Sequence, residues 1–214
     1  MTPSTILIVG HGPSLTGAGL GKEIDQYTVC RLKVFSRFHN KEDYGDRTDF
    51  ICATDSLIAG AVKYCPDAEP WIYFKMGRPK VKPHIEAYMP IEETNVWNRW
   101  FQNRCGYIGE GAKGRNYSIG TAAAIIAMGR EFKRIVFAGC DTLMDPELEY
   151  ESVYNPKTVH YLHHLWPVEN EMLHLCAEQK GVELCELSRL GVTKATRYTG
   201  DGFLKHGLNG PTSP

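Results

Sequence analysis

Short apolar runs that alternate with helical stretches are the feature of this 214-residue chain that most constrains its fold. The first run, Thr5–Gly10 (TILIVG), is apolar and ends in glycine, which is typical of a buried strand followed by a tight turn. Further strand-like runs are Tyr27–Val34, Asp49–Ala53, Trp71–Phe74, Arg134–Gly139 and Val182–Leu187. Helical patterns occur at Asp55–Tyr64, Thr94–Asn103, Ile119–Gly129 and Pro167–Gln179. The alternation predicts an α/β fold: a single Rossmann-like domain with a mostly parallel sheet and helices on both faces.

The length fits one domain with small additions, because domains usually hold ~100–200 residues. We predict that the domain covers residues 1–190. Residues 191–214 contain glycine and proline with weak periodicity, and we expect them to form a C-terminal tail. Residues 75–118 carry Pro79, Pro83 and Pro90 among many aromatic residues, which predicts a small irregular lid.

Composition excludes several classes of protein. Hydrophobic residues make up 43% and charged residues 23% of the chain, which excludes disorder, collagen and a coiled coil. Lysine and arginine total 24 against 25 acidic residues, so no overall charge attracts nucleic acid, although a local basic patch is compatible with this balance. No apolar run approaches the ~20 residues that span a bilayer. Because the first ten residues contain neither a basic region nor a cleavage-like site, we expect a cytoplasmic protein.

Seven cysteines are present, none of them in a C-x-x-C pair, and several lie within apolar runs. This pattern predicts buried thiols in a reducing compartment rather than disulfides or a zinc site.

The residues after the first strand, Gly10-His11-Gly12-Pro13-Ser14-Leu15, are a candidate ligand loop. Ligands of parallel sheets bind beyond the carboxyl ends of the strands, and glycine allows a close approach of the backbone to a phosphate or ribose. The spacing fits neither a Walker loop nor a dinucleotide fingerprint, because Leu15 occupies the position of the third glycine. A ligand loop and a plain tight turn therefore both remain open.

Three motifs, in order along the chain, resemble the conserved motifs of the sialyltransferases. The first comprises VGHGPSL, Gly21, Ile24-Asp25 and Val29-Cys30-Arg31. The second comprises Ser118-Ile119-Gly120, the apolar helix after it and Ala138-Gly139-Cys140-Asp141. The third comprises His160-Tyr161 and an H-x4-E pair, His164 and Glu169. Order and spacing agree over residues 6–187, with residues 60–115 unmatched, and the compact bacterial lipooligosaccharide sialyltransferases are nearest in size.

The resemblance implies an inverting, metal-independent glycosyltransferase. It would transfer a sugar from a nucleotide-sugar donor, by default a CMP-sugar, to a hydroxyl of a glycan or other acceptor, with no cofactor besides this co-substrate. Inversion needs a base on the acceptor side and groups that stabilise the departing phosphate. By family position His164 is the base and His160 a donor to the phosphate, while Glu169 either orients His164 or caps the helix that it begins.

The same resemblance implies a set of donor-binding residues at the ends of the strands and after them. These are Gly10, His11, Gly12, Pro13, Ser14, Arg31, Lys33, Thr54, Asp55, Ser118, Gly120, Asp141, Tyr150 and Tyr154.

This chain departs from the family at the donor contacts. Three asparagines that help to hold the donor in the bacterial enzymes correspond to His11, Lys33 and Thr54. A tyrosine that supports the leaving phosphate corresponds to Leu143. Lys33 would favour an anionic group of the donor, or else is a solvated lysine on an edge strand. We therefore expect CMP-sialic acid itself to be a poor donor.

Three alternatives follow from the remaining features. His160, His163 and His164 near Glu169 could bind zinc, but no acidic D-x-D pair follows a strand and the spacing does not suit one helix, so we predict no metal site. A basic run between residues 75 and 82, next to aromatic residues, suggests a UDP-sugar-dependent enzyme that acts on a hydroxylated DNA base. A nucleotide-binding module without catalysis is the third, and retention of His160 and His164 argues against it.

Overall fold

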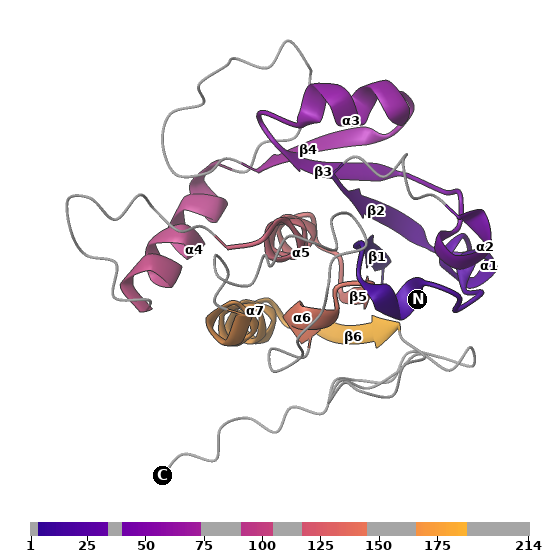
Figure 1. Ribbon diagram of the computed structural model, residues 1–214. Coiled ribbons are helices and arrows are strands. Elements are labelled where there is room, and N and C mark those ends of the chain that lie inside the picture. The colour runs from indigo at the N-terminus through magenta and orange to yellow at the C-terminus, as the bar shows by residue number, and fades with distance from the viewer. Residues whose placement is uncertain (1–3, 34–39, 74–90, 105–116, 145–165, 188–214) are drawn as a thin grey trace.

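The computed structural model describes residues 4–33, 40–73, 91–104, 117–144 and 166–187. Within these ranges one sheet contains six strands in the order β4-β3-β2-β1-β5-β6, and every neighbouring pair is parallel (Figure 1). The strands are β1 (Thr5–Val9), β2 (Thr28–Leu32), β3 (Phe50–Thr54), β4 (Glu69–Tyr73), β5 (Arg134–Ala138) and β6 (Glu183–Leu187). The predicted α/β fold with a parallel sheet is confirmed.

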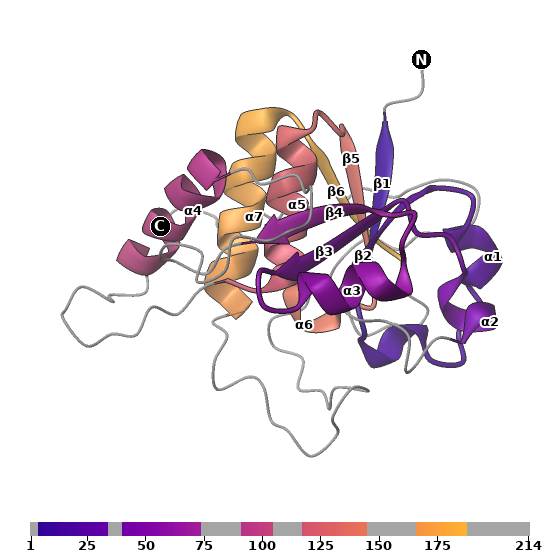
Figure 2. The ribbon, with the colours of Figure 1, turned by 90° about the horizontal axis from the view of Figure 1, so that it is seen from above.

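Helices cover both faces of the sheet (Figure 2). One face carries the short helices α1 (Gly21–Ile24), α2 (Lys41–Tyr44) and α3 (Ile58–Tyr64). The other carries α4 (Ile91–Arg104), α5 (Ile119–Gly129) and α7 (Trp166–Lys180). The 3-10 turn η1 (Pro13–Leu15) follows β1, and α6 (Asp141–Met144) follows β5. Alternation along each strand sends successive side chains to opposite faces, so each strand contributes to two cores.

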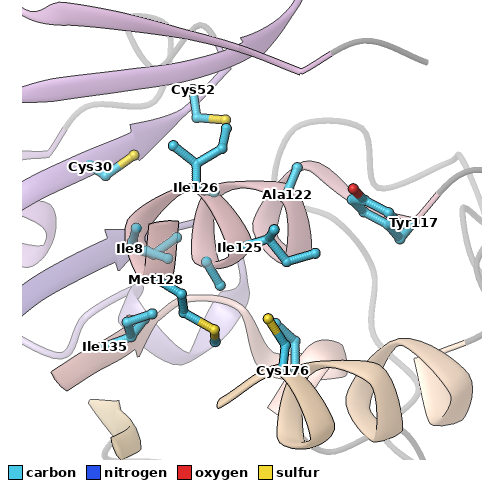
Figure 3. Close-up of a cluster of buried hydrophobic side chains, with 14 of the residues drawn as sticks. Ile8, Cys30, Cys52, Tyr117, Ala122, Ile125, Ile126, Met128, Ile135 and Cys176 are labelled. Atoms are coloured by element: carbon cyan, nitrogen blue, oxygen red, sulfur yellow. The ribbon is translucent and has the colours of Figure 1, made fainter. Parts of the chain in front are cut away.

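Helix α5 forms the centre of the larger core (Figure 3). Every residue from Gly120 to Met128 is buried, because α5 packs against strands β1 to β4 on one side and against α4 and α7 on the others. Ile126 faces Cys52 on β3, and Ile125 lies on the side of Cys176 of α7. A helix enclosed in this way has no polar face, which explains its almost entirely apolar sequence.

Strand β1, the first in the chain, lies in the middle of the sheet. From β1 the chain moves outward through β2, β3 and β4, and it returns to the other side of β1 for β5 and β6. All strands run the same way, so their carboxyl ends share one edge of the sheet. In open parallel sheets this edge is where ligands bind, near the strand at which the order reverses.

The predicted excursion at 75–118 contains α4, close to the helix expected at 94–103. Trp97 and Phe101 of α4 are buried in the larger core, so this part of the excursion belongs to the core. The six cysteines in the described ranges are free thiols, as predicted for them. None of the helices in those ranges is long and apolar enough to cross a membrane.

Candidate functional site

The loop after β1 packs directly against the loop after β5. The backbone N–H of Gly10 donates to the carbonyl of Ala138, and that of Gly12 donates to the carbonyl of Gly139, each over 2.7 Å. A Cβ at Gly10 would collide with the Gly139 carbonyl, and one at Gly12 would collide with the carboxylate of Asp141. Both glycines are therefore required because two loops touch at these points.

Asp141 fixes the other end of the same loop. Its carboxylate is 1% exposed, and Oδ2 accepts the backbone N–H of Ser14 over 2.9 Å while Oδ1 accepts the Ser14 hydroxyl. Burial raises the pKa of the Asp141 carboxyl, and the two bonds from Ser14 act against that rise. A buried acid thus holds the 3-10 turn η1 against the start of α6.

Backbone contacts bear on the two interpretations of the glycine-containing loop. The N–H groups of Gly10, Gly12, Ser14 and Leu15 all donate to acceptors within the protein, and Pro13 has no N–H. A phosphate cradle needs several backbone N–H groups that point at the ligand. These four N–H groups instead hold the turn together.

His11 lies between the carboxyl ends of β1 and β2. Its Nε2 is 2.9 Å from the carbonyl oxygen of Leu32. Burial, with a smaller contribution from the charges of Lys33 and Arg31, lowers the pKa of His11 to about 4, and the bond to Leu32 acts against this shift. The ring is neutral at pH 7, so Nε2 carries the proton that is donated to Leu32 and Nδ1 carries the lone pair. An acceptor atom thus occupies the position that the motif resemblance matches to an asparagine.

Lys33 follows β2 in a left-handed backbone conformation, with φ of 60°. Its backbone N–H donates to the carbonyl of Cys52 over 2.9 Å, which fixes the position of the residue relative to β3. The side chain is exposed at the carboxyl edge of the sheet. Asparagine and glycine adopt positive φ far more readily than lysine does. Lys33 therefore combines an unfavourable backbone conformation with a positive charge at this edge.

Thr54 and Asp55 shape the turn after β3. Thr54 is buried, and its hydroxyl oxygen lies 3.1 Å from that of Ser56. The carboxylate of Asp55 accepts the backbone N–H of Ser56 over 2.9 Å. This turn leads into α3 and brings two hydroxyls and a carboxylate to the same edge as His11.

The N-terminus of α5 is capped by residues from two distant segments. Ser118 is its N-cap, and its Oγ accepts the backbone N–H of Thr121 over 3.2 Å. Glu169, in the first turn of α7, is 0% exposed. Its Oε2 accepts the backbone N–H of Ser118 over 2.8 Å and the hydroxyl of Thr121 over 2.6 Å. Glu169 therefore caps a neighbouring helix, an arrangement that the sequence did not predict.

Asn170, the next residue of α7, makes a second contact with the site. Its Nδ2 donates to the backbone carbonyl of Leu143 in α6 over 2.9 Å. The side chain of Leu143 approaches Gly120, another predicted donor-binding residue, which is buried between Leu143 and Leu32. Sequence analysis missed Asn170, for which a polar residue at the start of a helix was the only signal.

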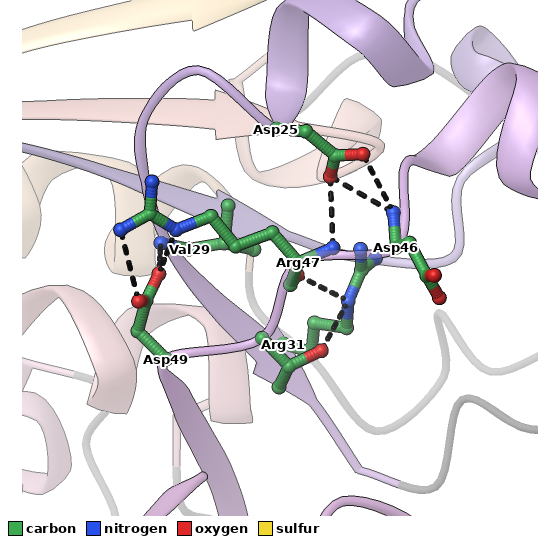
Figure 4. Close-up of polar contacts among 7 residues, drawn as sticks. Asp25, Val29, Arg31, Asp46, Arg47 and Asp49 are labelled. Atoms are coloured by element: carbon green, nitrogen blue, oxygen red, sulfur yellow. Dashed lines mark hydrogen bonds and ion pairs between the residues drawn. The ribbon is translucent and has the colours of Figure 1, made fainter. Parts of the chain in front are cut away.

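Arg31, predicted to bind the donor, is a residue of β2, and its buried side chain contacts the segment that precedes β3 (Figure 4). Its Nε donates to the carbonyl of Arg47 over 3.1 Å and to the hydroxyl of Thr48 over 2.9 Å, and a terminal nitrogen donates to the carbonyl of Tyr44 over 3.1 Å. Asp25 of the same motif accepts the backbone N–H of Arg47 over 2.8 Å. This part of the first motif holds the framework of the loop together.

The structure thus brings most of the predicted donor-binding residues to one edge of the sheet. Those described there are Gly10, His11, Gly12, Pro13, Ser14, Lys33, Thr54, Asp55, Ser118, Gly120 and Asp141. The predicted residues His160, His164, Tyr150 and Tyr154 lie outside the described residues, as does the basic run between residues 75 and 82. Within the described part of the chain no group of three or more potential metal ligands occurs.

No protein-family model matches the sequence, and no curated protein matches it. Solved structures do match. Sialyltransferase CstII from Campylobacter jejuni, in complex with the substrate analogue cytidine-5'-monophosphate, aligns with a TM-score of 0.56 and 14% identity over 88% of this chain and 81% of that chain. The chain has the sialyltransferase fold. The resemblance seen in the three motifs is thereby confirmed at the level of the fold.

Two further structures with the sialyltransferase fold give the same result. A Cst-II variant with phenylalanine in place of a tyrosine, in complex with CMP, aligns with a TM-score of 0.56 and 15% identity, over 86% of this chain and 81% of that chain. A mammalian sialyltransferase in complex with Gal-beta-1-3GalNAc-ortho-nitrophenol aligns with a TM-score of 0.51 and 13% identity, over 86% of this chain and 70% of that chain. The fold is therefore shared across very low sequence identity.

Proposed function

We propose that the protein is an inverting glycosyltransferase that transfers a sugar from a nucleotide-sugar donor to an acceptor hydroxyl without a metal ion. The observation that carries the proposal is the sialyltransferase fold, together with residues of the first two motifs at the carboxyl edge of its sheet. Two of the similar structures contain CMP, which supports a CMP-sugar as the default donor. In this proposal His164 is the base and His160 stabilises the departing phosphate.

The charges at this edge suggest how the donor is held. Four N–H groups of the loop after β1 donate to acceptors within the protein, and Asp141 and Glu169 are both buried acids, which do not favour a phosphate. Lys33 is the cation that the described residues place at the ends of β1 to β3, and it is exposed. We assign it to an anionic group of the donor, because lysine meets such groups as a point charge.

The test is a competition among CMP-sialic acid, other CMP-sugars, UDP-sugars and GDP-sugars, with kcat/KM measured for each. We expect a donor other than CMP-sialic acid to be preferred, because His11 and Lys33 stand where the related enzymes have asparagines. The proposal of an altered donor is contradicted if CMP-sialic acid wins by tenfold or more, about 1.4 kcal/mol of transition-state discrimination.

Two variants accompany the competition. Lys33→Asn should erode the advantage of the preferred donor, since it removes the charge and relieves the backbone strain. His164→Ala should lower turnover by ~10²–10⁴-fold while donor binding survives. Turnover near that of the wild type in His164→Ala would remove His164 from the role of base, and the absence of transfer from every donor would contradict the activity itself.

A further inference from the structure

The first turn of α7 contacts two separate elements of the candidate donor site. Glu169 binds Ser118 and Thr121 at the start of α5, and Asn170 binds the backbone of Leu143 in α6. Both elements are far from α7 in the sequence, since Ser118 is 51 positions from Glu169 and Leu143 is 27 positions from Asn170. Two adjacent residues of α7 thus fix the position of α5 relative to α6.

The hydrogen bonds that Glu169 accepts from Ser118 and Thr121 are linked to one another. The Thr121 hydroxyl gives its proton to the carboxylate, so in its 3.0 Å contact with Ser118 the Thr121 oxygen accepts the proton of the Ser118 hydroxyl. Ser118 Oγ in turn accepts the backbone N–H of Thr121. One buried carboxylate therefore sets the backbone of Ser118 and the direction of its hydroxyl. A charged acceptor makes such bonds stronger than a neutral one does.

Asn170 contacts α6 rather than α5. Its amide holds the end of α6, whose first residue is Asp141, the anchor of the loop after β1. Leu143 also lies against Gly120 of α5. A shift of α6 would consequently move both the Ser14 turn and the start of α5.

We propose that Glu169 and Asn170, here called the α7 clamp, are positioning residues for the donor nucleotide. This inference rests on the proposed function. The clamp holds Ser118 and the α6 segment at the separation that the nucleotide requires, and neither clamp residue touches the donor. Holding a binding group within a fraction of an ångström is what gives such residues their effect on binding and turnover.

The decisive variants differ by one atom from the wild type. Glu169→Gln keeps an oxygen that accepts from Ser118 and Thr121, and we expect CMP to bind within about threefold of the wild type. Asn170→Asp has the same shape but replaces the donor with an oxygen that faces the carbonyl of Leu143. We expect Asn170→Asp and Glu169→Ala to weaken CMP binding roughly 10- to 100-fold, as displaced binding groups do.

Two controls on the same helix separate positioning from general loss of stability. Glu171→Gln removes a half-exposed ion pair with Arg104, 3.2 Å long, and should leave CMP affinity unchanged. Cys176→Ala opens space in the buried core against α5 without touching the clamp, so it should lower the melting temperature but not CMP affinity. Equal weakening of CMP binding by Cys176→Ala and Asn170→Asp would overturn the proposal.

A second measurement keeps the two proposals apart. If the wild type binds none of CMP, UDP and GDP, the proposed function fails. The clamp is then tested by amide hydrogen exchange at residues 118–121 and 141–144, which requires no ligand. Faster exchange at the first segment in Glu169→Ala, and at the second in Asn170→Asp, supports the clamp, whereas unchanged exchange in both variants refutes it.

Discussion

His11 shows how one side chain changes the chemistry at the end of a strand. Burial lowers its pKa from 6.5 to about 4, so the unfolded chain binds a proton between these values that the folded chain does not. The folded state therefore loses stability as the pH falls from about 6.5 to about 4. The full contribution is at most about 3.5 kcal/mol, at about 1.4 kcal/mol per pH unit.

The prediction for His11→Asn is that this pH-dependent component disappears. Urea unfolding of the wild type and the variant at pH 7, 5.5 and 4 measures it, as the difference between their free energies of unfolding at each pH (pH values chosen roughly to bracket the window). We expect the free energy of unfolding of the variant to rise relative to that of the wild type as the pH falls. A constant difference across the series would mean that the pKa of His11 is the same in the folded protein as in the unfolded chain.

The contribution of Asp141 to stability changes with pH in the opposite direction. Its folded pKa is raised, so the folded state retains a proton that the unfolded chain releases, and the contribution of this group to stability declines as the pH rises through the folded pKa. Its two bonds from Ser14 act against that cost. Burial disfavours the charge of Asp141, whereas its oxygens accept two hydrogen bonds from Ser14. We therefore predict that the loop needs an oxygen acceptor at this position rather than a charge.

Two substitutions test this balance. Asp141→Ala leaves the N–H and hydroxyl of Ser14 buried without their acceptor, and we expect it to lower the free energy of unfolding at pH 7 by about 2–3 kcal/mol. Asp141→Asn keeps one oxygen acceptor and cannot ionise, so its loss should be below about 1 kcal/mol and should shrink further as the pH rises. Denaturant unfolding at two pH values measures both, and equal losses in the two variants would show that the charge itself is needed.

At the scale of elements, sequence patterns predicted those structures that are long enough to show a period. The six strands and helices α3, α4, α5 and α7 were all predicted, with ends that shift by a few residues. Helices α1, α2 and α6 were missed because each has four residues, which is too short for helical periodicity. They exist because neighbouring elements hold them, as Gly21 shows by lying against the backbone of α2.

The contacts of the site were harder to predict than its elements. Residues at the ends of strands were identified because the fold places them at one edge. The pairing of Ser14 with Asp141 spans 127 residues, and no local pattern specifies it. For Glu169 the sequence predicted a catalytic role or a cap on its own helix, and both stay predictions, because His164 lies outside the described residues. The contact of its carboxylate with the start of α5 could not be predicted, since only tertiary packing brings the two helices together. The glycines before Ser14 likewise have a packing reason that the sequence left open.

On the scale of the whole molecule, the sheet divides the protein into a framework side and a side that supports the candidate site. The face that carries α1 and α2 holds a network of backbone and charged groups around Arg31 and Asp25. The face that carries α5 and α7 holds the larger apolar core, and the α7 clamp lies at its carboxyl edge. Residues of the first two motifs that resemble those of the sialyltransferases serve both sides, so part of each motif supports the fold itself.

The last prediction concerns metal ions and follows from how the carboxylates of the whole molecule are used. A metal-dependent transferase needs at least two ligating groups turned toward the donor phosphate. In the described ranges the buried acids at the carboxyl edge, Asp141 and Glu169, already accept hydrogen bonds from Ser14, Ser118 and Thr121. We expect sugar transfer to continue at an unchanged rate in a large excess of EDTA, measured after the protein has been dialysed against the chelator. Loss of transfer that manganese or zinc restores would contradict this, and it would revive the histidines near His160 as a metal site.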